Sequence, residues 1–253
     1  MKKSVFCFLL MLILAKPCVA EEATIAVASN FTSAMQELAT DFERQSGHRI
    51  HLAFGSSGKF FAQISNGAPF DAFFSADQAK PAALEQAGQT VSGSRLTYAV
   101  GALALWSINQ QMDQNGDVLR RNQFNKLALA NPRLAPYGAA AVQVLTNLGL
   151  DKTSRAKWVQ GENISQTYQF VGSGNADLGF VALSQIYANG QLAQGSAWIV
   201  PKELYAPIRQ DAVVLKKGEK NQAVIDLFAY LKTKRARSVI ESFGYQNEGP
   251  AIE

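Results

Sequence analysis

Apolar runs and amphipathic stretches alternate along the first third of this chain. Thr24–Ser29 (TIAVAS) predicts a buried strand, and Thr32–Gln45, with apolar residues at positions 35, 38, 39 and 42, has the spacing of a helix. Gly47 ends this helix, and Arg49–Phe54 (RIHLAF) alternates as a second strand. A short helix, a strand and a further helix are expected at Phe60–Asn66, Asp71–Ala76 and Ala79–Gln86. Strands and helices in repetition, joined by short loops, predict an α/β fold with a largely parallel sheet.

The same pattern starts again in the second third of the chain. Leu96–Ser107 (LTYAVGALALWS) is a long apolar run that predicts two strand segments joined near Gly101. Further strands are expected at Lys126–Ala130, Trp158–Gln160, Leu178–Ala182 and Ala197–Val200, and helices at Ala139–Leu148 and Ser165–Val171. Leu204–Val214 looks like a crossing segment, and Asn221–Leu231 has the pattern of an amphipathic closing helix.

Two similar halves in one chain predict two α/β lobes. We expect the first lobe to comprise residues 21–100, with residues 209–253 returning to it. The second lobe is expected over residues 101–208. Lobes joined by crossing segments enclose a hinged cleft, which is a common place for a ligand to bind.

The first twenty residues have the pattern of an export signal. Lys2 and Lys3 form a charged region, Val5–Leu14 forms an apolar region, and Cys18-Val19-Ala20 offers a cleavage site with small residues. The apolar region is too short for a helix that spans a bilayer, and no polar residues alternate within it as they would in a buried first helix. We therefore expect residues 1–20 to be removed on export to the periplasm.

Removal of this signal changes the chemistry of the chain. Both cysteines, Cys7 and Cys18, lie in the signal, so the mature chain has no disulfide, thiol nucleophile or thiolate metal site. The full chain has 24 Lys and Arg against 20 Asp and Glu, and loss of three signal lysines leaves 21 against 20. The mature protein is nearly neutral, so its composition does not predict a nucleic-acid partner.

Hydrogen-bond donors follow several of the predicted strands. Ligands of open α/β sheets bind at the carboxyl ends of strands. The segments that follow strands or start helices are Ser29-Asn30, Gly55–Gly58, Asn131–Gly138 and Asn163–Ser165. Each offers hydroxyl, amide or free backbone N–H groups, which an anion can use. Such residues are also ordinary helix caps, but their recurrence in both halves favours an anion site.

Catalytic chemistry has weaker support in this sequence. The stretch FGSSGK (54–59) is not a Walker A loop, since Phe60 stands where a magnesium-binding hydroxyl belongs, and Lys59 is expected to reach solvent. The chain has two histidines, His48 and His51, and no G-x-S-x-G elbow. An exported hydrolase that uses Ser57 and Lys59 would lack a base, so we predict that the protein is not an enzyme.

Four segments in their order along the chain resemble one protein family. They are Ala26–Phe31 (AVASNF), Phe54–Gly58 (FGSSG), Gly67–Asp77 (GAPFDAFFSAD) and Asp177–Ala182 (DLGFVA). Together they closely resemble the periplasmic molybdate-binding proteins of ABC importers, the ModA family. The resemblance runs from about Ala23 to the last helix. It implies a type II periplasmic binding-protein fold, in which crossover strands join two α/β lobes with a ligand cleft between them.

The resemblance also implies a ligand and the residues that bind it. The ligand would be molybdate or tungstate, held by neutral donors and delivered to the membrane subunits of an ABC importer. By motif, the first lobe would contribute Ser29, Asn30 and Ser57. The second lobe would contribute Tyr137 in its P-Y-G turn and the backbone N–H of Ile164. The resemblance implies no cofactor, no catalytic residue and a monomeric protein.

One position departs from the family pattern. Some members place a ligand-binding tyrosine after the strand that ends near Val181, where this chain has Ala182. Asn30 and Tyr137 are the candidates to replace that donor, and the order of preference among oxyanions is left open. The alternatives are a binding protein for another tetrahedral oxyanion, such as chromate or sulfate, and the effector domain of a transcription regulator. The export signal argues against the regulator.

Overall fold

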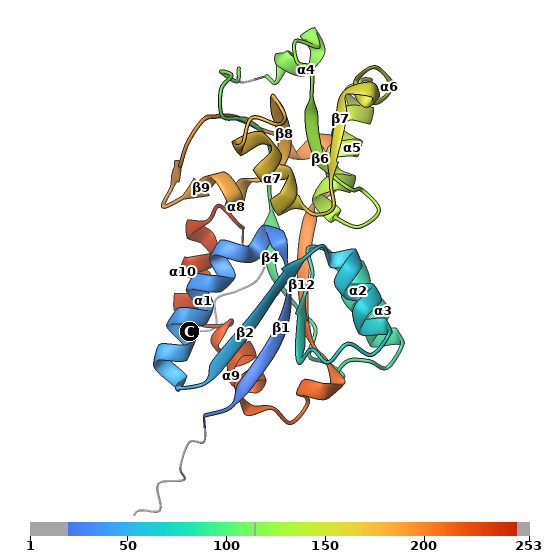
Figure 1. The fold of residues 1–253 in the computed structure, drawn as a ribbon. Helices are drawn as coiled ribbons and strands as arrows, with labels where there is room; N and C mark the ends of the chain where they lie inside the picture. The colour runs from blue at the N-terminus through green and yellow to red at the C-terminus, as the bar shows by residue number, and fades with distance from the viewer. Residues whose placement is uncertain (1–19, 114, 247–253) are drawn as a thin grey trace, which may run out of the picture.

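The structure, a computed structural model, describes residues 20–113 and 115–246. It has two lobes, which lie one above the other in Figure 1. The predicted export signal lies, apart from its last residue, outside the described residues. In the part of the chain that is described, no helix combines the length and the apolar character that crossing a bilayer requires.

The first lobe is built on a five-stranded sheet in the order β2-β1-β3-β12-β4. Its strands are β1 (Glu22–Ala28), β2 (Arg49–Gly55), β3 (Ala72–Phe74), β4 (Leu96–Gly101) and β12 (Ile208–Val214). β1 pairs in parallel with β2 and β3, whereas β12 runs antiparallel to both β3 and β4. The sheet is therefore mixed rather than largely parallel, because β12 enters it from the other lobe.

The second lobe repeats this arrangement in the order β11-β5-β8-β6-β7. Its strands are β5 (Leu103–Ser107), β6 (Leu127–Ala130), β7 (Trp158–Gly161), β8 (Leu178–Ala182) and β11 (Ser196–Ile199), and β9 (Tyr187–Ala188) and β10 (Gln191–Leu192) form a separate hairpin. β6 pairs in parallel with β7 and β8, and β5 runs antiparallel to β8 and β11.

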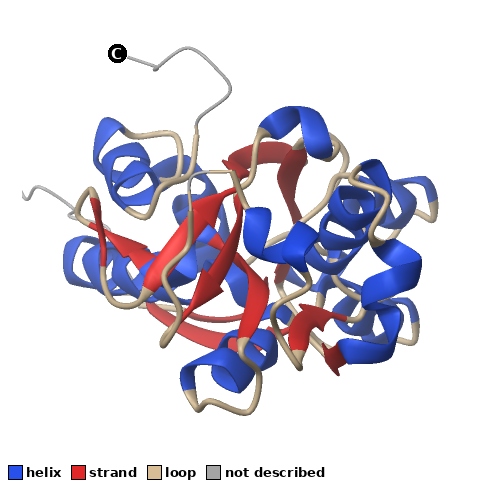
Figure 2. Ribbon diagram, turned by 90° about the horizontal axis from the view of Figure 1, so that it is seen from above, coloured by secondary structure: helices blue, strands red, loops and turns tan. Residues whose placement is uncertain are grey.

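Helices cover both faces of each sheet, as Figure 2 shows from above. In the first lobe they are α1 (Thr32–Ser46), α2 (Ser57–Ser65), α3 (Ala79–Gln86), α9 (Gln222–Tyr230) and α10 (Lys234–Ser242). In the second lobe they are α4 (Asp117–Arg121), α5 (Pro136–Asn147), α6 (Asp151–Ser154), α7 (Ile164–Gly172) and α8 (Leu183–Ile186). Short 3-10 turns are η1 (Ser29–Phe31), η2 (Arg155–Lys157), η3 (Lys202–Leu204) and η4 (Lys216–Gly218).

Alternation along the strands divides the core of the first lobe into two layers. Ile25 and Val27 of β1 pack with α1, α9 and α10, whereas Ala26 packs with α2 and α3. Neighbouring side chains of a strand point to opposite faces of the sheet, so both faces are buried. This explains why the strands appear in the sequence as continuous apolar runs.

Two connections link the lobes. β4 leads into β5 through Ala102, and the chain returns from β11 to β12 over residues 200–207. β4 and β12 are paired, and in Figure 1 they lie side by side where the lobes meet. The predicted division of the apolar run near Gly101 therefore coincides with the crossing between the lobes.

Most predicted elements are present, with three notable differences. α2 begins at Ser57 rather than Phe60, since the hydroxyl of Ser56 caps it by accepting from the Lys59 amide. The predicted helix at 139–148 begins at Pro136, a residue suited to the first turn. The helix at 221–231 does not close the chain, because α10 follows it and packs against α1 in the same core.

Candidate functional site

A small cavity lies between the lobes, where the ends of β1 and β2 face the starts of α5 and α7. Its volume is about 10 Å³, roughly the room that one water molecule needs. Its lining residues are Ala28, Ser29, Asn30, Gly55, Ser56, Ser57, Ala76, Ala135, Pro136, Tyr137 and Ile164. All five predicted site residues are among them, three from the first lobe and two from the second. Of the described residues that line the cavity, none has a charged side chain.

Four helix starts meet at this cavity. Ser29 begins η1, Ser57 begins α2, Ile164 begins α7, and Tyr137 is the second residue of α5. First-turn N–H groups have no acceptor within their own helix, and the helix dipole gives them partial positive charge. The cavity therefore combines hydrogen-bond donors with a favourable potential for an anion, without a formal charge in its wall.

The side chain of Ser57 is held as a donor. Its buried hydroxyl oxygen accepts a hydrogen bond of 2.9 Å from the backbone N–H of Ala76. Because this contact uses a lone pair, the hydroxyl proton remains available for a ligand. The neighbouring Ser56 instead caps α2 through the amide of Lys59.

Tyr137 is the residue with a side-chain hydroxyl that was predicted for the second lobe, and it lines the cavity. Its hydroxyl is buried and accepts a bond of 3.2 Å from Nε2 of Gln210. Burial raises the pKa of Tyr137 well above its ordinary value, so it stays protonated at neutral pH. The next residue must be small, because a Cβ on Gly138 would lie 2.1 Å from the carbonyl oxygen of Ala130. The P-Y-G turn thus packs the start of α5 tightly against the end of β6.

The side chain of Asn30 is engaged within the protein. Its Nδ2 donates to Oε1 of Gln210 at 2.7 Å and to the hydroxyl of Tyr245 at 3.0 Å. The backbone carbonyl oxygen of Asn30 accepts from the hydroxyls of Ser184 and Tyr245. Since both amide protons are used, the group that Asn30 can still offer to a ligand is its backbone N–H in η1.

A buried polar network behind the cavity includes residues that the sequence did not predict. Gln210 is fully buried on β12, and Tyr98 and Tyr245 are also buried. Tyr98 donates to the carbonyl oxygen of Ser75 or to Oε1 of Gln210, both at 3.0 Å. The available signal in the sequence was a run of three polar residues, Arg209-Gln210-Asp211, inside the strand IRQDAVV.

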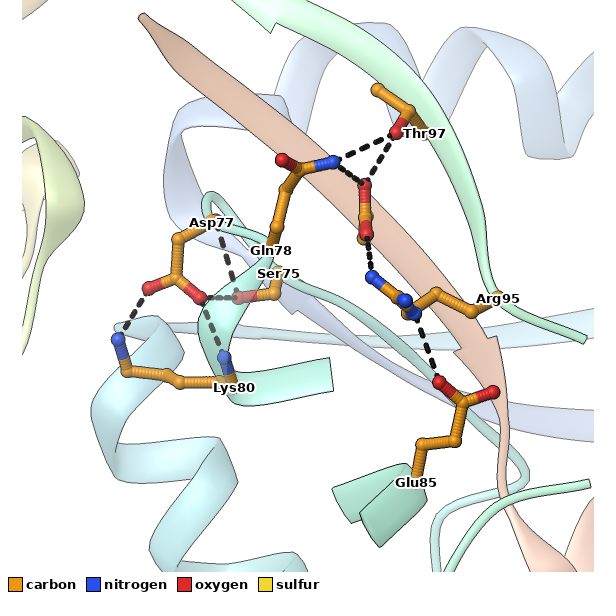
Figure 3. A network of polar contacts seen from close by, with 8 residues as sticks. Ser75, Asp77, Gln78, Lys80, Glu85, Arg95 and Thr97 are labelled. Carbon is orange, nitrogen blue, oxygen red and sulfur yellow. Dashed lines mark hydrogen bonds and ion pairs between the residues drawn. The ribbon is translucent and has the colours of Figure 1, made fainter. Parts of the chain in front are cut away.

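Asp211, the next residue of β12, anchors this strand within the first lobe. Its carboxylate accepts from the hydroxyl of Thr97 at 2.7 Å, from Nε2 of Gln78 at 3.0 Å and from Nη1 of Arg95 at 3.1 Å. Arg95 pairs with this carboxylate and with that of Glu85, and Figure 3 shows Arg95 beside Glu85 and Gln78 beside Thr97. The contacts tie β12 to β4 and to the start of α3, so the strand is held firmly beside the cavity.

Lys59 does not simply reach solvent, as the sequence had suggested. Its Nζ lies 2.8 Å from Oε1 of Glu162 on the second lobe, and both side chains are about half-exposed. Next to it, the amide of Gly58 donates to the carbonyl oxygen of Leu134 at 2.8 Å. The FGSSGK loop therefore carries two contacts between the lobes as well as Ser57.

Ala182 lies at the end of β8 and is fully buried. It is not among the described residues that line the cavity, whereas Tyr137 is. Among the described residues, no cluster of His, Cys, Asp and Glu has the makings of a metal site. The chemistry that the cavity offers is hydrogen-bond donation from neutral groups.

Comparison with known proteins places the chain in a family. Residues 23–246 match the family described as bacterial extracellular solute-binding protein. The molybdate-binding protein ModA of Azotobacter vinelandii is 53% identical over 227 residues, which cover 89% of this chain and 90% of that protein. The chain belongs to the ModA family. ModA of Rhodobacter capsulatus is 44% identical over 236 residues, 93% of this chain and 92% of its own.

A solved structure extends the comparison to the fold. The periplasmic molybdate-binding protein of Azotobacter vinelandii matches this ModA-family structure with a TM-score of 0.86 and 40% identity. The match covers 90% of this chain and all of that one. The predicted family and the periplasmic binding-protein fold, with two α/β lobes, are confirmed. The family is one of solute-binding proteins.

Proposed function

We propose that this protein captures molybdate in the periplasm and delivers it to an ABC importer. The observation that supports the proposal is that five residues with neutral donor groups, from both lobes, line one cavity. Ser29, Asn30 and Ser57 come from one side, and Tyr137 and Ile164 from the other. The relatives that are 53% and 44% identical are named molybdate-binding proteins.

Neutral donors suit a dianion that has to leave water. Each hydrogen bond to a charged acceptor contributes about 1.5–3 kcal/mol net. Several such bonds outweigh the cost of association and give micromolar binding or better, at about −8 kcal/mol. A wall of donors also favours a fully deprotonated anion, since a protonated oxygen would meet another donor.

Selection among tetrahedral anions follows from the distance between the two sets of donors. A larger anion such as molybdate or tungstate can accept hydrogen bonds from the donors of both lobes at once. A smaller one such as sulfate can accept at full strength only from the donors of one lobe. Tungstate is therefore expected to bind as molybdate does. Chromate or sulfate as the preferred ligand is the alternative that a competition experiment distinguishes.

The lobes are proposed to move as units, residues 21–100 with 209–253 against residues 101–208. Binding proteins close around their ligands by hinge motion, and the two crossing connections are where the hinge would bend. The closed monomer would be the form that the membrane subunits of the importer recognise. No cofactor and no catalytic step is needed for this cycle.

Calorimetry on the mature protein, freed of ligand, tests the function. The panel is molybdate, tungstate, chromate, sulfate and phosphate. We expect one site per chain, tight binding of molybdate and tungstate, and weak or undetectable heat with sulfate and phosphate. Equal heats for sulfate and molybdate would overturn the selectivity. A turnover assay with generic esters tests the hydrolase alternative, and no product is expected.

A further inference from the structure

Tyr245 has its ring in the core of the first lobe and its hydroxyl where the two lobes meet. The residue is buried, and its ring packs in the same core as α1, α9 and α10. The ring lies edge-on to that of Phe31, the last residue of η1, with 5.2 Å between the ring centroids. Tyr245 is thereby fixed beside the 3-10 turn that brings Ser29 and Asn30 to the cavity.

The hydroxyl of Tyr245 makes two contacts with Asn30. It lies 2.8 Å from the backbone carbonyl oxygen of Asn30, and it accepts from the side-chain Nδ2 at 3.0 Å. The main chain and the side chain of one cavity-lining residue are therefore held by a single group. Asn30 directly follows β1 of the first lobe, so these two contacts do not depend on where the second lobe lies.

The same hydroxyl also meets two residues of the second lobe. Its oxygen lies 2.9 Å from Oγ of Ser184 on α8, and the hydroxyl of Tyr137 on α5 is a further hydrogen-bond partner. The hydroxyl of Ser184 in turn donates to the backbone carbonyl oxygen of Asn30 at 2.9 Å. Oxygens of three residues thus lie within hydrogen-bond distance of one another, and they join η1 of the first lobe to α8 of the second.

The segment around Tyr245 is itself held by both lobes. On the side of the first lobe, Val100 of β4 and Gln246 exchange backbone hydrogen bonds of 2.8 and 3.0 Å. On the side of the second lobe, the backbone N–H of Asn189 donates to the carbonyl oxygen of Ser242 at 3.1 Å. The last part of the described chain is therefore a non-covalent link between the lobes, beside the two connections that the chain makes through β4 and β12.

We infer that Tyr245 is a positioning residue for anion binding, because its hydroxyl holds Asn30 and Tyr137 in the relative position in which both line the cavity. The inference rests on the proposed function. Tyr245 is not among the described residues that line the cavity, so it acts through those that do. Its contacts with Ser184 and Tyr137 exist while the lobes meet, and water would replace them when the lobes part.

Tyr245→Phe tests the inference in the mature protein, since it keeps the ring and removes the hydroxyl. We expect molybdate to bind about tenfold more weakly in calorimetry. Because the lost contacts between the lobes form when the lobes meet, release of molybdate should be faster in stopped-flow measurements, while the rate of capture stays within about twofold. A residue that served stability alone would leave both rates unchanged. Unchanged release, or a loss that lies in the capture rate, would overturn the inference.

Ser184→Ala is the second variant, because it removes the partner of the same hydroxyl on the other lobe. It is also expected to speed molybdate release, by about threefold to tenfold. Both variants remove the contact between Tyr245 and Ser184, so the double variant should lose less than the product of the two single losses. Losses that multiply would show that the two residues act independently, and the inferred link between the lobes would be wrong.

Tyr230→Phe is the matched control. Tyr230 is a buried tyrosine of the same core, and its hydroxyl donates to Asp41 within the first lobe at 2.7 Å. The variant therefore loses a buried hydrogen bond without changing a contact between the lobes. Thermal unfolding of the ligand-free protein should show a loss of stability for both tyrosine variants, but only Tyr245→Phe should release molybdate faster. Equal acceleration in both would assign the effect to a destabilised first lobe and would contradict the inference.

Tungstate provides a further readout, because the hydroxyl of Tyr245 is expected to act without touching the anion. Tyr245→Phe should weaken molybdate and tungstate by the same factor, and a loss for one of them alone would contradict the indirect role. If the original protein binds molybdate and Tyr245→Phe behaves as the original does, this inference falls and the proposed function stands. If the original protein binds none of molybdate, tungstate, chromate, sulfate and phosphate, the proposed function falls, and this inference with it.

Discussion

The backbone amide of Gly58 donates a hydrogen bond of 2.8 Å to the carbonyl oxygen of Leu134, so the main chains of the two lobes touch beside Ser57. A Cβ on Gly58 would lie 2.9 Å from Cα of Leu134, closer than such atoms approach in proteins. This contact joins the two lobes as the structure shows them, and it lies in the loop that carries a predicted ligand donor.

Replacement of Gly58 by Ala is therefore expected to hinder closure. We expect about tenfold weaker molybdate binding in calorimetry, equivalent to about 1.4 kcal/mol. The unfolding temperature of the ligand-free protein should change little, because each lobe keeps its own core. The control is Gly172→Ala, where the added Cβ would meet Trp106 at an ordinary 3.6 Å. Equal affinities for the Gly58 and Gly172 variants would contradict this role.

The ion pair between Lys59 and Glu162 should act on the lifetime of the closed complex. Both side chains are half-exposed, so the pair contributes at most about 1 kcal/mol and is screened by salt. Lys59→Glu is expected to speed molybdate release in stopped-flow measurements at low salt, and Glu162→Lys added to it should restore the rate. Lys216→Glu, which breaks a pair within the first lobe, is the control. If the swapped pair did not restore the release rate, the ion pair would not be what sets the lifetime of the complex.

Ser57→Ala tests the predicted donor in the first lobe most directly. Removal of the hydroxyl leaves one anion oxygen without its partner, at a cost of about 1–3 kcal/mol in binding free energy. Ser94→Ala is a matched control, because Ser94 also accepts from a backbone N–H of the first lobe, that of Val214 at 3.2 Å. Both variants should lose stability, but only Ser57→Ala should lose affinity. Unchanged affinity would exclude Ser57 from the site.

Much of the fold could be predicted from local sequence. The strand at Thr24–Ser29 and the helix at Thr32–Gln45 were predictable because their apolar residues follow the periods of buried strands and helices. α10 was missed because its buried residues, Ala236, Val239 and Ile240, stand among charged and polar neighbours. Their spacing of three and four residues is nevertheless that of a helix, and the apolar face it forms packs into the core that includes α1.

The site, like the fold, has a part that the local sequence predicts and a part that it does not. Its lining residues lie at strand ends and helix starts, where small hydroxyl residues and glycine are visible in the sequence. Gln210 and Tyr245 were not predicted, since they contact Asn30 across 180 and 215 residues of chain. Those contacts depend on the returning strand and the last segment of the chain, which no local pattern specifies.

Asp41 should make the stability of the first lobe depend on acid pH. Its buried carboxylate accepts from the Tyr230 hydroxyl at 2.7 Å and from Nε of Arg235 at 3.2 Å, which ties α1 to α9 and α10. The bond from Tyr230 and the charges of Arg235 and Arg44 lower the pKa of Asp41 below its ordinary 3.8.

A carboxyl group with a lowered folded-state pKa adds stability at higher pH that is lost as pH falls. The contribution of Asp41 should be complete above about pH 5 and should decline through pH 3.8 towards the lower folded-state pKa. Asp41→Asn is expected to unfold at lower temperature at pH 7 and to lose less stability on acidification from pH 5 to 3. Tyr230→Phe, which removes the largest cause of the shift, should give an intermediate slope. Thermal unfolding across this pH range measures all three proteins, and parallel curves for the original protein and Asp41→Asn would show that this carboxylate is not the titrating group.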